Sequence, residues 1–189
     1  MRIISGTLKS TPLYWLPVLS NIIPPSIRRQ NNLLREFKKI SSNQSLPVHE
    51  VIMPVHRRLK SRSPPLVTAK RLLEEAYDGI AAWKRGWIDS APTAWHPLLD
   101  PNSPPPGFQL PRKLWVTLNR VRTGHGRCGA NLTKWGFSTN PACDCGASLQ
   151  TTEHITFDCP SRTFGGTRED FLRATPEAVL WLEQLDVRL

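Results

Sequence analysis

The feature that most constrains the fold is a group of three cysteines and one histidine near the C-terminal end of the sequence. Cys143 and Cys145 flank a single residue, His154 follows after eight intervening residues, and Cys159 follows after four more. Three thiolates and one imidazole are a ligand set that suits tetrahedral zinc. Zinc can contribute on the order of 10 kcal/mol to the folding of a segment too short to bury a core of its own. We therefore predict one structural zinc ion, held by Cys143, Cys145, His154 and Cys159, in a knuckle at about 143–160 that is disordered without metal.

The residues around these ligands favour such a site. Gly146 can adopt a positive φ in a tight turn after the two cysteines, and Thr152 is placed to cap a short helix that carries His154 and Cys159. A gap of one residue between the first two cysteines is shorter than the usual two to four, so coincidental positions or a redox pair are alternative interpretations. The same gap is poor geometry for a disulfide between the two cysteines, which favours metal.

The fourth cysteine, Cys128, lies outside this group on a predicted helix. We expect it to be a small buried residue, and a fourth sulfur ligand is the alternative. No secretory signal is evident, so the cysteines are expected in a reducing compartment, where metal ligation is commoner than disulfides. No window approaches the roughly 18 apolar residues of a membrane span. We expect an intracellular protein, cytoplasmic and nuclear, with no membrane partner.

The formal net charge of +10 is unevenly distributed along the sequence. Residues 1–66 hold 11 Lys or Arg against 2 Asp or Glu, residues 67–127 hold 9 against 5, and residues 128–189 hold 5 against 8. This gradient favours an anionic partner, of which nucleic acid is the commonest for a basic intracellular chain. A solvated basic surface is the alternative, because net charge governs association and not fold.

Hydrophobic periodicity predicts two helices in the first half of the sequence. Apolar residues recur at intervals of three, four and seven over 26–40, and a second stripe runs over 68–87 with Thr68 as its N-cap. Gly79 weakens the second helix and favours a bend there. The stripe carries tryptophans that, with Trp115, are either core residues or platforms on which bases stack.

Three further helices are predicted in the second half. Pro111 opens a stripe that ends in a glycine turn at 123–126, and a second arm over 128–135 completes a helical hairpin. A last helix follows Thr175 as its cap, with proline in the first turn.

Proline clusters predict where these helices are linked. The 18 prolines include clusters at 24–25, 64–65 and 104–106, where consecutive prolines force extended backbone. We expect residues 1–66 to form a basic segment with one helix and a flexible linker, and residues 67–110 an amphipathic helix and a Pro-rich connector. Residues 111–189 would hold the hairpin, the knuckle and the last helix. The predicted fold class is mainly α, a loose helical assembly with Pro-rich linkers and a small C-terminal zinc knuckle.

Basic residues near the glycine turn are candidates for binding phosphate groups. They are Arg112, Lys113, Arg120, Arg122, His125 and Arg127. Lysine and arginine neutralise phosphates, and His125 lies between two glycines whose exposed amides could bind the same group. For His125 the alternative is a contact within the turn. The basic face of the helix over 26–40 could also bind a nucleic-acid backbone, and the alternative there is a surface exposed only to solvent.

No residue pattern indicates catalysis. The sequence has no Asp-Asp pair for two-metal phosphoryl transfer, no glycine loop of the Walker type, and no Ser, His and Asp at a spacing typical of a triad. We expect this chain to be no enzyme and to have no small-molecule substrate.

Taken together, these residues resemble the C-terminal, post-polymerase region of jockey-type non-LTR retrotransposon reverse transcriptases, over most of the chain. The resemblance rests on the stretches 2–7, 16–22, 106–112 and 118–127, on Pro24-Pro25 and Arg28-Arg29, on Cys143, Cys145, His154 and Cys159-Pro160, and on the ending at 182–186. The single residue between Cys143 and Cys145 departs from the wider pattern of these proteins, although the jockey-like branch tolerates it.

The resemblance implies a helical region whose knuckle assists binding of template RNA or target DNA during target-primed reverse transcription. It also implies a parent polyprotein of a transposable element that is an RNA-directed DNA polymerase, with endonuclease, fingers and palm missing from this sequence. The implied partners are RNA, DNA or both, and the upstream polymerase domain. The alternative class is a structural piece that docks on the polymerase core through apolar helix faces and is inactive alone.

Overall fold

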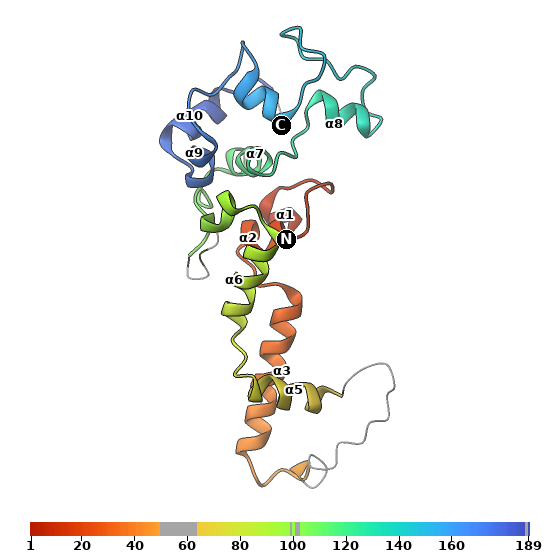
Figure 1. Ribbon diagram of the computed structural model, residues 1–189, viewed down its shortest axis with the longest axis vertical. Helices are drawn as coiled ribbons and strands as arrows, with labels where there is room; N and C mark the ends of the chain where they lie inside the picture. The colour runs from red at the N-terminus through yellow and green to blue at the C-terminus, as the bar shows by residue number, and fades with distance from the viewer. Residues whose placement is uncertain (50–63, 99, 101–102, 188) are drawn as a thin grey trace. The chain divides into compact units, whose positions relative to one another are not determined.

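The computed structural model describes residues 1–49, 64–98, 100, 103–187 and 189. These residues form helices joined by turns and contain no strand, which confirms the mainly α fold class (Figure 1). Most of the flexible linker predicted up to residue 66 lies outside the described residues. No helix in the described part of the chain is long and apolar enough to cross a membrane. The elements are, in chain order, α1 (Arg2–Ser5), α2 (Trp15–Ser20), α3 (Pro25–Ser42), α5 (Pro65–Glu74), α6 (Gly79–Ser90), η1 (Thr93–Leu98), α7 (Arg112–Thr123), α8 (Gly129–Lys134), η2 (His154–Asp158), α9 (Arg168–Arg173) and α10 (Pro176–Gln184).

The described chain divides into two compact units. One contains residues 1–22 and 90–189, and the other contains residues 23–89. These boundaries differ from those of the three segments predicted from the sequence. The difference arises because residues 1–22 fold with the C-terminal part of the chain, whereas α3 packs against α5.

In the unit of residues 23–89, the helix predicted over 26–40 is confirmed as α3. It begins at Pro25 and buries Ile27, Leu34 and Phe37. These side chains lie on one face because their spacings of seven and three positions match the helical repeat. The face gives α5 an apolar surface to pack against.

The single helix predicted over 68–87 is wrong, because the chain forms two helices there. Ala76 adopts a φ of 47°, and its amide donates to the carbonyl of Leu73 at 3.1 Å. A left-handed residue of this kind ends a helix. The predicted cap is also wrong, since α5 begins at Pro65, upstream of Thr68.

The bend predicted at Gly79 is a complete break, after which α6 begins. A Cβ atom at Gly79 would lie 2.4 Å from Oδ1 of Asn31 in α3, so a larger residue there would require the Asn31 side chain to move. Trp83 and Trp87 of α6 are 4% and 3% exposed, and Trp115 in the other unit is 3% exposed. The three tryptophans are therefore core residues and not platforms for stacking bases.

In the unit of residues 1–22 and 90–189, the core forms around α7. Leu114, Trp115 and Leu118 of α7 pack in one cluster with Phe171 of α9 and Leu182 of α10. The apolar stripe predicted for this helix is the face that the cluster buries. Burial of such side chains stabilises the fold by roughly 1.5–3 kcal/mol each.

The predicted ends of these helices are present. Pro111 directly precedes α7, and Gly124 ends it with a φ of 67°. Thr175 caps α10 by accepting a hydrogen bond from the amide of Ala178 at 3.4 Å. Gly124 and Thr175 satisfy main-chain groups that a helix end leaves without a partner, whereas Pro111 makes no side-chain cap hydrogen bond.

The N-terminal residues join this unit through polar contacts with α7. Nδ2 of Asn119, which is fully buried, donates to the carbonyl of Ser5 at 2.9 Å. Gly6 has a φ of 69°, and a Cβ atom there would lie 2.3 Å from Cγ2 of Val116. Glycine at this position thus permits α1 to lie against α7.

The second arm predicted over 128–135 is confirmed as α8, which ends before Gly136 with its φ of 78°. The amides of Gly129 and Ala130 donate to Oε1 and to the main-chain oxygen of Gln150, each at 2.9 Å. A Cβ atom at Gly129 would lie 2.9 Å from the carbonyl oxygen of Pro141. The start of α8 is therefore fixed against the loop that carries the first two cysteines.

Candidate metal centre

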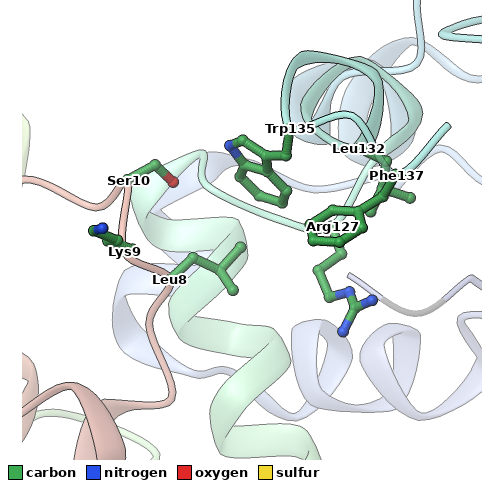
Figure 2. A pocket seen from close by; sticks show the side chains of 7 residues that line it. All are labelled: Leu8, Lys9, Ser10, Arg127, Leu132, Trp135 and Phe137. Atoms are coloured by element: carbon green, nitrogen blue, oxygen red, sulfur yellow. The ribbon is translucent and has the colours of Figure 1, made fainter. Parts of the chain in front are cut away.

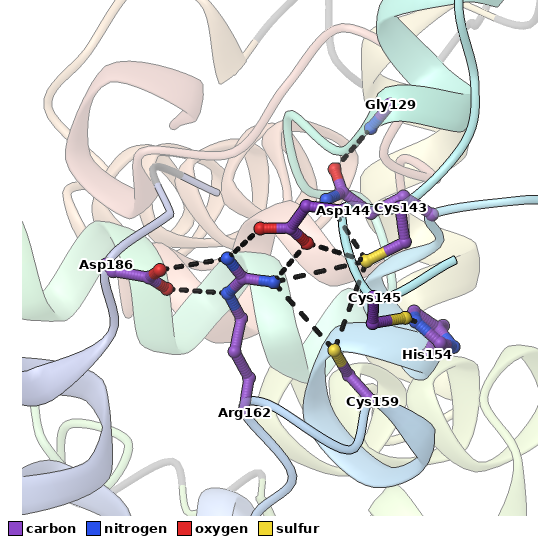
Figure 3. A network of polar contacts seen from close by, with 9 residues as sticks. Gly129, Cys143, Asp144, Cys145, His154, Cys159, Arg162 and Asp186 are labelled. Carbon is purple, nitrogen blue, oxygen red and sulfur yellow. Dashed lines mark hydrogen bonds and ion pairs between the residues drawn. The ribbon is translucent and has the colours of Figure 1, made fainter. Parts of the chain in front are cut away.

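The four residues predicted as metal ligands lie together in the structure. Their ligand atoms, three Sγ atoms and one imidazole nitrogen, all lie within 4.8 Å of one another. Cys143 Sγ is 3.9 Å from Cys159 Sγ, and Cys145 Sγ is 3.3 Å from His154 Nε2 (Figure 3). Cys143 and Cys159 are buried, and Cys145 and His154 are half-buried. The group could hold one metal ion.

The first two ligands sit in a tight turn. The amide of Cys143 donates to the carbonyl of Ala147 at 2.8 Å, and the amide of Gly146 donates to the carbonyl of Cys143 at 3.1 Å. Gly146 adopts a φ of 95°, as predicted. This turn directs Cys143 and Cys145 to the same point although only one residue separates them.

The other two ligands are brought together by η2, a single π-helical turn. The amide of Cys159 donates to the carbonyl of His154 at 2.7 Å, which is a bond between residues five apart. In an α-helix, residues five apart point about 140° away from each other, and the wider π turn removes most of that rotation. The short helix was predicted, but its π geometry was not.

The residue that caps this turn differs from the prediction. Oγ1 of Thr151 accepts the amide of His154 at 2.9 Å, so Thr151 and not Thr152 caps it. Oγ1 of Thr152 accepts the amide of Gly126 at 3.0 Å instead. Thr152 therefore ties the metal loop to the glycine turn after α7.

Arg162 connects the ligands to the C-terminal segment. Its Nη1 atom donates to Oδ1 of Asp144 at 2.5 Å, and its Nε atom donates to Oδ1 of Asp186 at 2.6 Å. The same Nη1 atom lies 3.8 Å from Cys159 Sγ and 4.0 Å from Cys143 Sγ (Figure 3). The Arg162 side chain is 8% exposed. A buried cation at this place offsets negative charge on the sulfur ligands.

The surroundings shift the pKa values of these groups in opposite directions. Burial raises the pKa of the Cys143 thiol. Burial opposes ionisation of Cys159 too, but the amide of Ser161 and the guanidinium of Arg162 together lower its pKa. The hydrogen bond from Arg162 lowers the pKa of Asp144, and the two carboxylates raise the pKa of Arg162. Arg162 thus favours the ionised forms of Cys159 and Asp144.

Cys128 is not part of this group. It is 2% exposed and packs with Ile155 and Leu189. Its prediction as a small buried residue is confirmed.

Three of the six predicted phosphate contacts line one groove. Arg112, Lys113 and Arg120 lie along a groove of about 720 Å³ between α7 and the segment after α10, with Asp186 on its other side. Nη1 of Arg112 donates to the carbonyl of Ile4 at 2.5 Å, and Nε of Arg120 donates to the carbonyl of Gly6 at 3.2 Å. Arg112 also donates to the carbonyl of Ile3, and Arg120 to that of Leu189, so these side chains offer a phosphate in the groove mainly their positive charge.

Arg122 is placed differently from the prediction. It is 4% exposed, and its guanidinium donates to the carbonyls of Phe171 at 2.8 Å, Leu172 at 2.9 Å and Pro106 at 2.8 Å. Burial lowers its pKa to about 9, so it remains charged at neutral pH. Its N–H groups donate to main-chain carbonyls inside the unit. Arg122 is therefore a structural residue and is not placed to contact a phosphate.

His125 and Arg127 lie in the turn between α7 and α8. His125 is half-buried, and burial together with the charge of Lys134 lowers its pKa. A neutral imidazole can donate one hydrogen bond to a phosphate but adds no positive charge. Arg127 is exposed and lines a second hollow of the surface.

No protein-family model, curated protein or solved structure matches this chain. Among the residues of the site, the sequence did not lead us to Arg162 or Gln150. Nε2 of Gln150 donates to Cys143 Sγ at 3.6 Å. No sequence signal identifies Arg162, because its burial and its contact with the ligands arise only in the fold.

Proposed function

We propose that this chain is a zinc-stabilised nucleic-acid-binding module from the C-terminal region of a retrotransposon reverse transcriptase. The observation that carries the proposal is the convergence of Cys143, Cys145, His154 and Cys159 in the same unit as a groove lined by cations. The module would bind RNA or target DNA, inside the cell and in the nucleus, while the polymerase domain of the parent protein performs the chemistry.

Donor type and geometry support zinc as the metal. A tetrahedral zinc ion with Zn–S bonds of about 2.3 Å and a Zn–N bond of about 2.0–2.1 Å has S···S edges of about 3.8 Å and S···N edges of about 3.5 Å. The pairs Cys143–Cys159 at 3.9 Å and Cys145–His154 at 3.3 Å lie near these values. Four protein ligands leave no open position, which supports a structural role for one zinc ion.

Nucleic acid as the partner is supported by the charge of the chain and by the basic groove. The net charge is +10, and Arg112, Lys113 and Arg120 face the groove along α7. Cations arranged along a groove neutralise successive phosphates and release their counterions. Arg127, in the turn after α7, lines the second hollow and not this groove.

The family assignment rests on the sequence resemblance to jockey-type non-LTR retrotransposon proteins. The ligand order Cys, Cys, His, Cys and the stretch 118–127 before it are the parts of the resemblance that fall on the site. The convergence of these ligands supports it. The proposed role is to assist binding of template RNA or target DNA in target-primed reverse transcription.

A salt titration tests this function. Binding of labelled RNA and DNA oligonucleotides to the zinc-loaded chain is measured by fluorescence anisotropy. We expect log K to fall by about 0.7–0.9 per neutralised phosphate for each tenfold increase in salt. Lys113→Gln should reduce the slope by roughly one phosphate, whereas Lys84→Gln, an exposed lysine on α6, is the matched control. Salt-independent binding, or no binding, would contradict the proposal.

A second candidate function is docking on the polymerase core. Exposed apolar side chains favour it, because Ile3 is 88% exposed and Leu13 is 73% exposed. Docking on another protein would cover such side chains. Concentration-dependent association that Ile3→Asp abolishes, in a chain that binds no nucleic acid, would favour docking over the first proposal.

A further inference from the structure

A second hollow of the surface lies beside α8 and is distinct from the metal centre. It has a volume of about 530 Å³, which is within the range of ligand sites. Figure 2 shows the side chains around it, which are Leu8, Lys9, Ser10, Arg127, Leu132, Trp135 and Phe137. We call it the aromatic groove.

The lining of the aromatic groove combines exposed rings with cations. Phe137 is 79% exposed, and Trp135 is half-buried. Lys9 and Arg127 are exposed, and the lining contains no carboxylate. Among the described residues, neither Lys9 nor Arg127 forms an ion pair. Apolar rings accessible to solvent between two free cations suit a ligand that has both flat apolar faces and negative charge.

The backbone holds the rings in place. The amide of Phe137 donates to the carbonyl of Leu132 at 2.9 Å, and Gly136 has a φ of 78°, which together form a helix-ending turn. Such turns often bring an apolar side chain at this position onto the last turn of the helix. The high exposure of Phe137 shows that this contact covers little of the ring, so the ring is available to a ligand.

The groove is also connected to the metal centre. Gln150 donates to Cys143 Sγ at 3.6 Å and accepts the amide of Gly129, the first residue of α8, at 2.9 Å. Since α8 carries Leu132 and leads directly into Trp135, the position of the groove wall depends on the loop that holds the ligands.

We propose that the aromatic groove binds an unpaired base of single-stranded nucleic acid, which stacks on Phe137 and Trp135 while Lys9 and Arg127 bind the flanking phosphates. This inference rests on the proposed function and adds to it the site where bases are bound. Aromatic stacking accepts any base because every base has a π face. Charge complementarity favours a nucleic acid over an apolar peptide, because a peptide of that kind gives Lys9 and Arg127 no anion to bind.

The experiment compares oligonucleotides with and without bases. Affinities of the zinc-loaded chain for a labelled single-stranded RNA, a DNA of the same sequence and an abasic oligonucleotide of the same length are measured by fluorescence anisotropy. Phe137→Ala should weaken binding of the first two by about 5- to 150-fold and leave binding of the abasic strand unchanged. Leu180→Ala, which removes an apolar side chain that is 54% exposed on α10, is the matched control and should change none of the three.

Folding is monitored through zinc content and circular dichroism, and Trp135→Phe, which keeps a flat ring, should retain most of the affinity. The inference is supported if Phe137→Ala lowers the affinity for the RNA or the DNA strand but not for the abasic strand. Equal affinity for the abasic strand, or no effect of Phe137→Ala, would overturn it while nucleic-acid binding stands. Absence of binding to all three strands would instead overturn the proposed function. Capture of an acidic, aromatic peptide that Phe137→Ala abolishes, without any base dependence, would assign the groove to a protein partner.

Discussion

Replacing Arg162 with glutamine removes the only buried cation in contact with both the metal ligands and the C-terminal segment among the described residues. The guanidinium lies 3.8 Å from Cys159 Sγ and 4.0 Å from Cys143 Sγ, and its side chain is 8% exposed. Its carboxylate partners, Asp144 and Asp186, have side chains that are 60% and 63% exposed, so solvent screens these pairs and their own contribution is small. The main effect is therefore expected on zinc affinity.

Loss of a group in the second layer around a metal lowers affinity by about 10- to 100-fold, which corresponds to about 1.4–2.7 kcal/mol. Competition with a chromophoric chelator measures the zinc affinity of the purified chain. Arg162→Lys keeps the charge but loses the planar fork, so its affinity should be intermediate. Arg173→Gln is the control, because Arg173 is 72% exposed and pairs only with Glu169 at 2.6 Å among the described residues. If Arg162→Gln binds zinc as tightly as the unmutated chain, Arg162 does not support the metal ligands in this way.

Three further substitutions test other parts of the structure. Leu118→Ala removes a fully buried side chain of α7 and should lower the free energy of unfolding by about 2–5 kcal/mol in chemical denaturation of the zinc-bound chain. Arg122→Leu leaves the carbonyls that Arg122 binds without their donor and should cost about 2 kcal/mol or more in the same assay, with the salt dependence of nucleic-acid binding unchanged. Gly146→Ala forces a side chain onto a φ of 95°, and the resulting strain of about 1–3 kcal/mol should appear as weaker zinc binding in the chelator competition.

Each of these substitutions has a result that counts against the structure. Near-normal stability of Leu118→Ala would mean that α7 does not form the core. A weaker salt dependence of nucleic-acid binding in Arg122→Leu would show that Arg122 does contact a phosphate. Unchanged zinc affinity in Gly146→Ala would show that the turn does not require a positive φ.

The features predicted correctly from the sequence depend on short stretches of chain. The four ligands are close in sequence, and the type of each side chain limits its chemistry. The stop at Gly124 and the cap at Thr175 are likewise local, because each acts on main-chain groups of its own helix. Periodicity identified α3 because its buried residues Ile27, Leu34 and Phe37 recur at helical spacing.

The features that the sequence did not reveal depend on contacts between distant residues. Ala76 has no intrinsic preference for a positive φ, so its local sequence does not predict the break between α5 and α6. The attachment of Ser5 to Asn119 joins residues 114 positions apart, and no local pattern encodes it. The burial of Arg122 could have been predicted, since it continues the stripe of Trp115 and Leu118 at helical spacing.

The most direct test of the central claim is the zinc content of the purified chain. Elemental mass spectrometry is performed on the unmutated chain and on the double variant Cys143→Ser, Cys159→Ser, both purified without chelator. We expect about one zinc per chain in the former, lost in the latter, because Cys143 and Cys159 supply two of the four converging ligands. An unmutated chain without zinc, or a double variant that keeps a full equivalent, would contradict the claim that zinc organises this module.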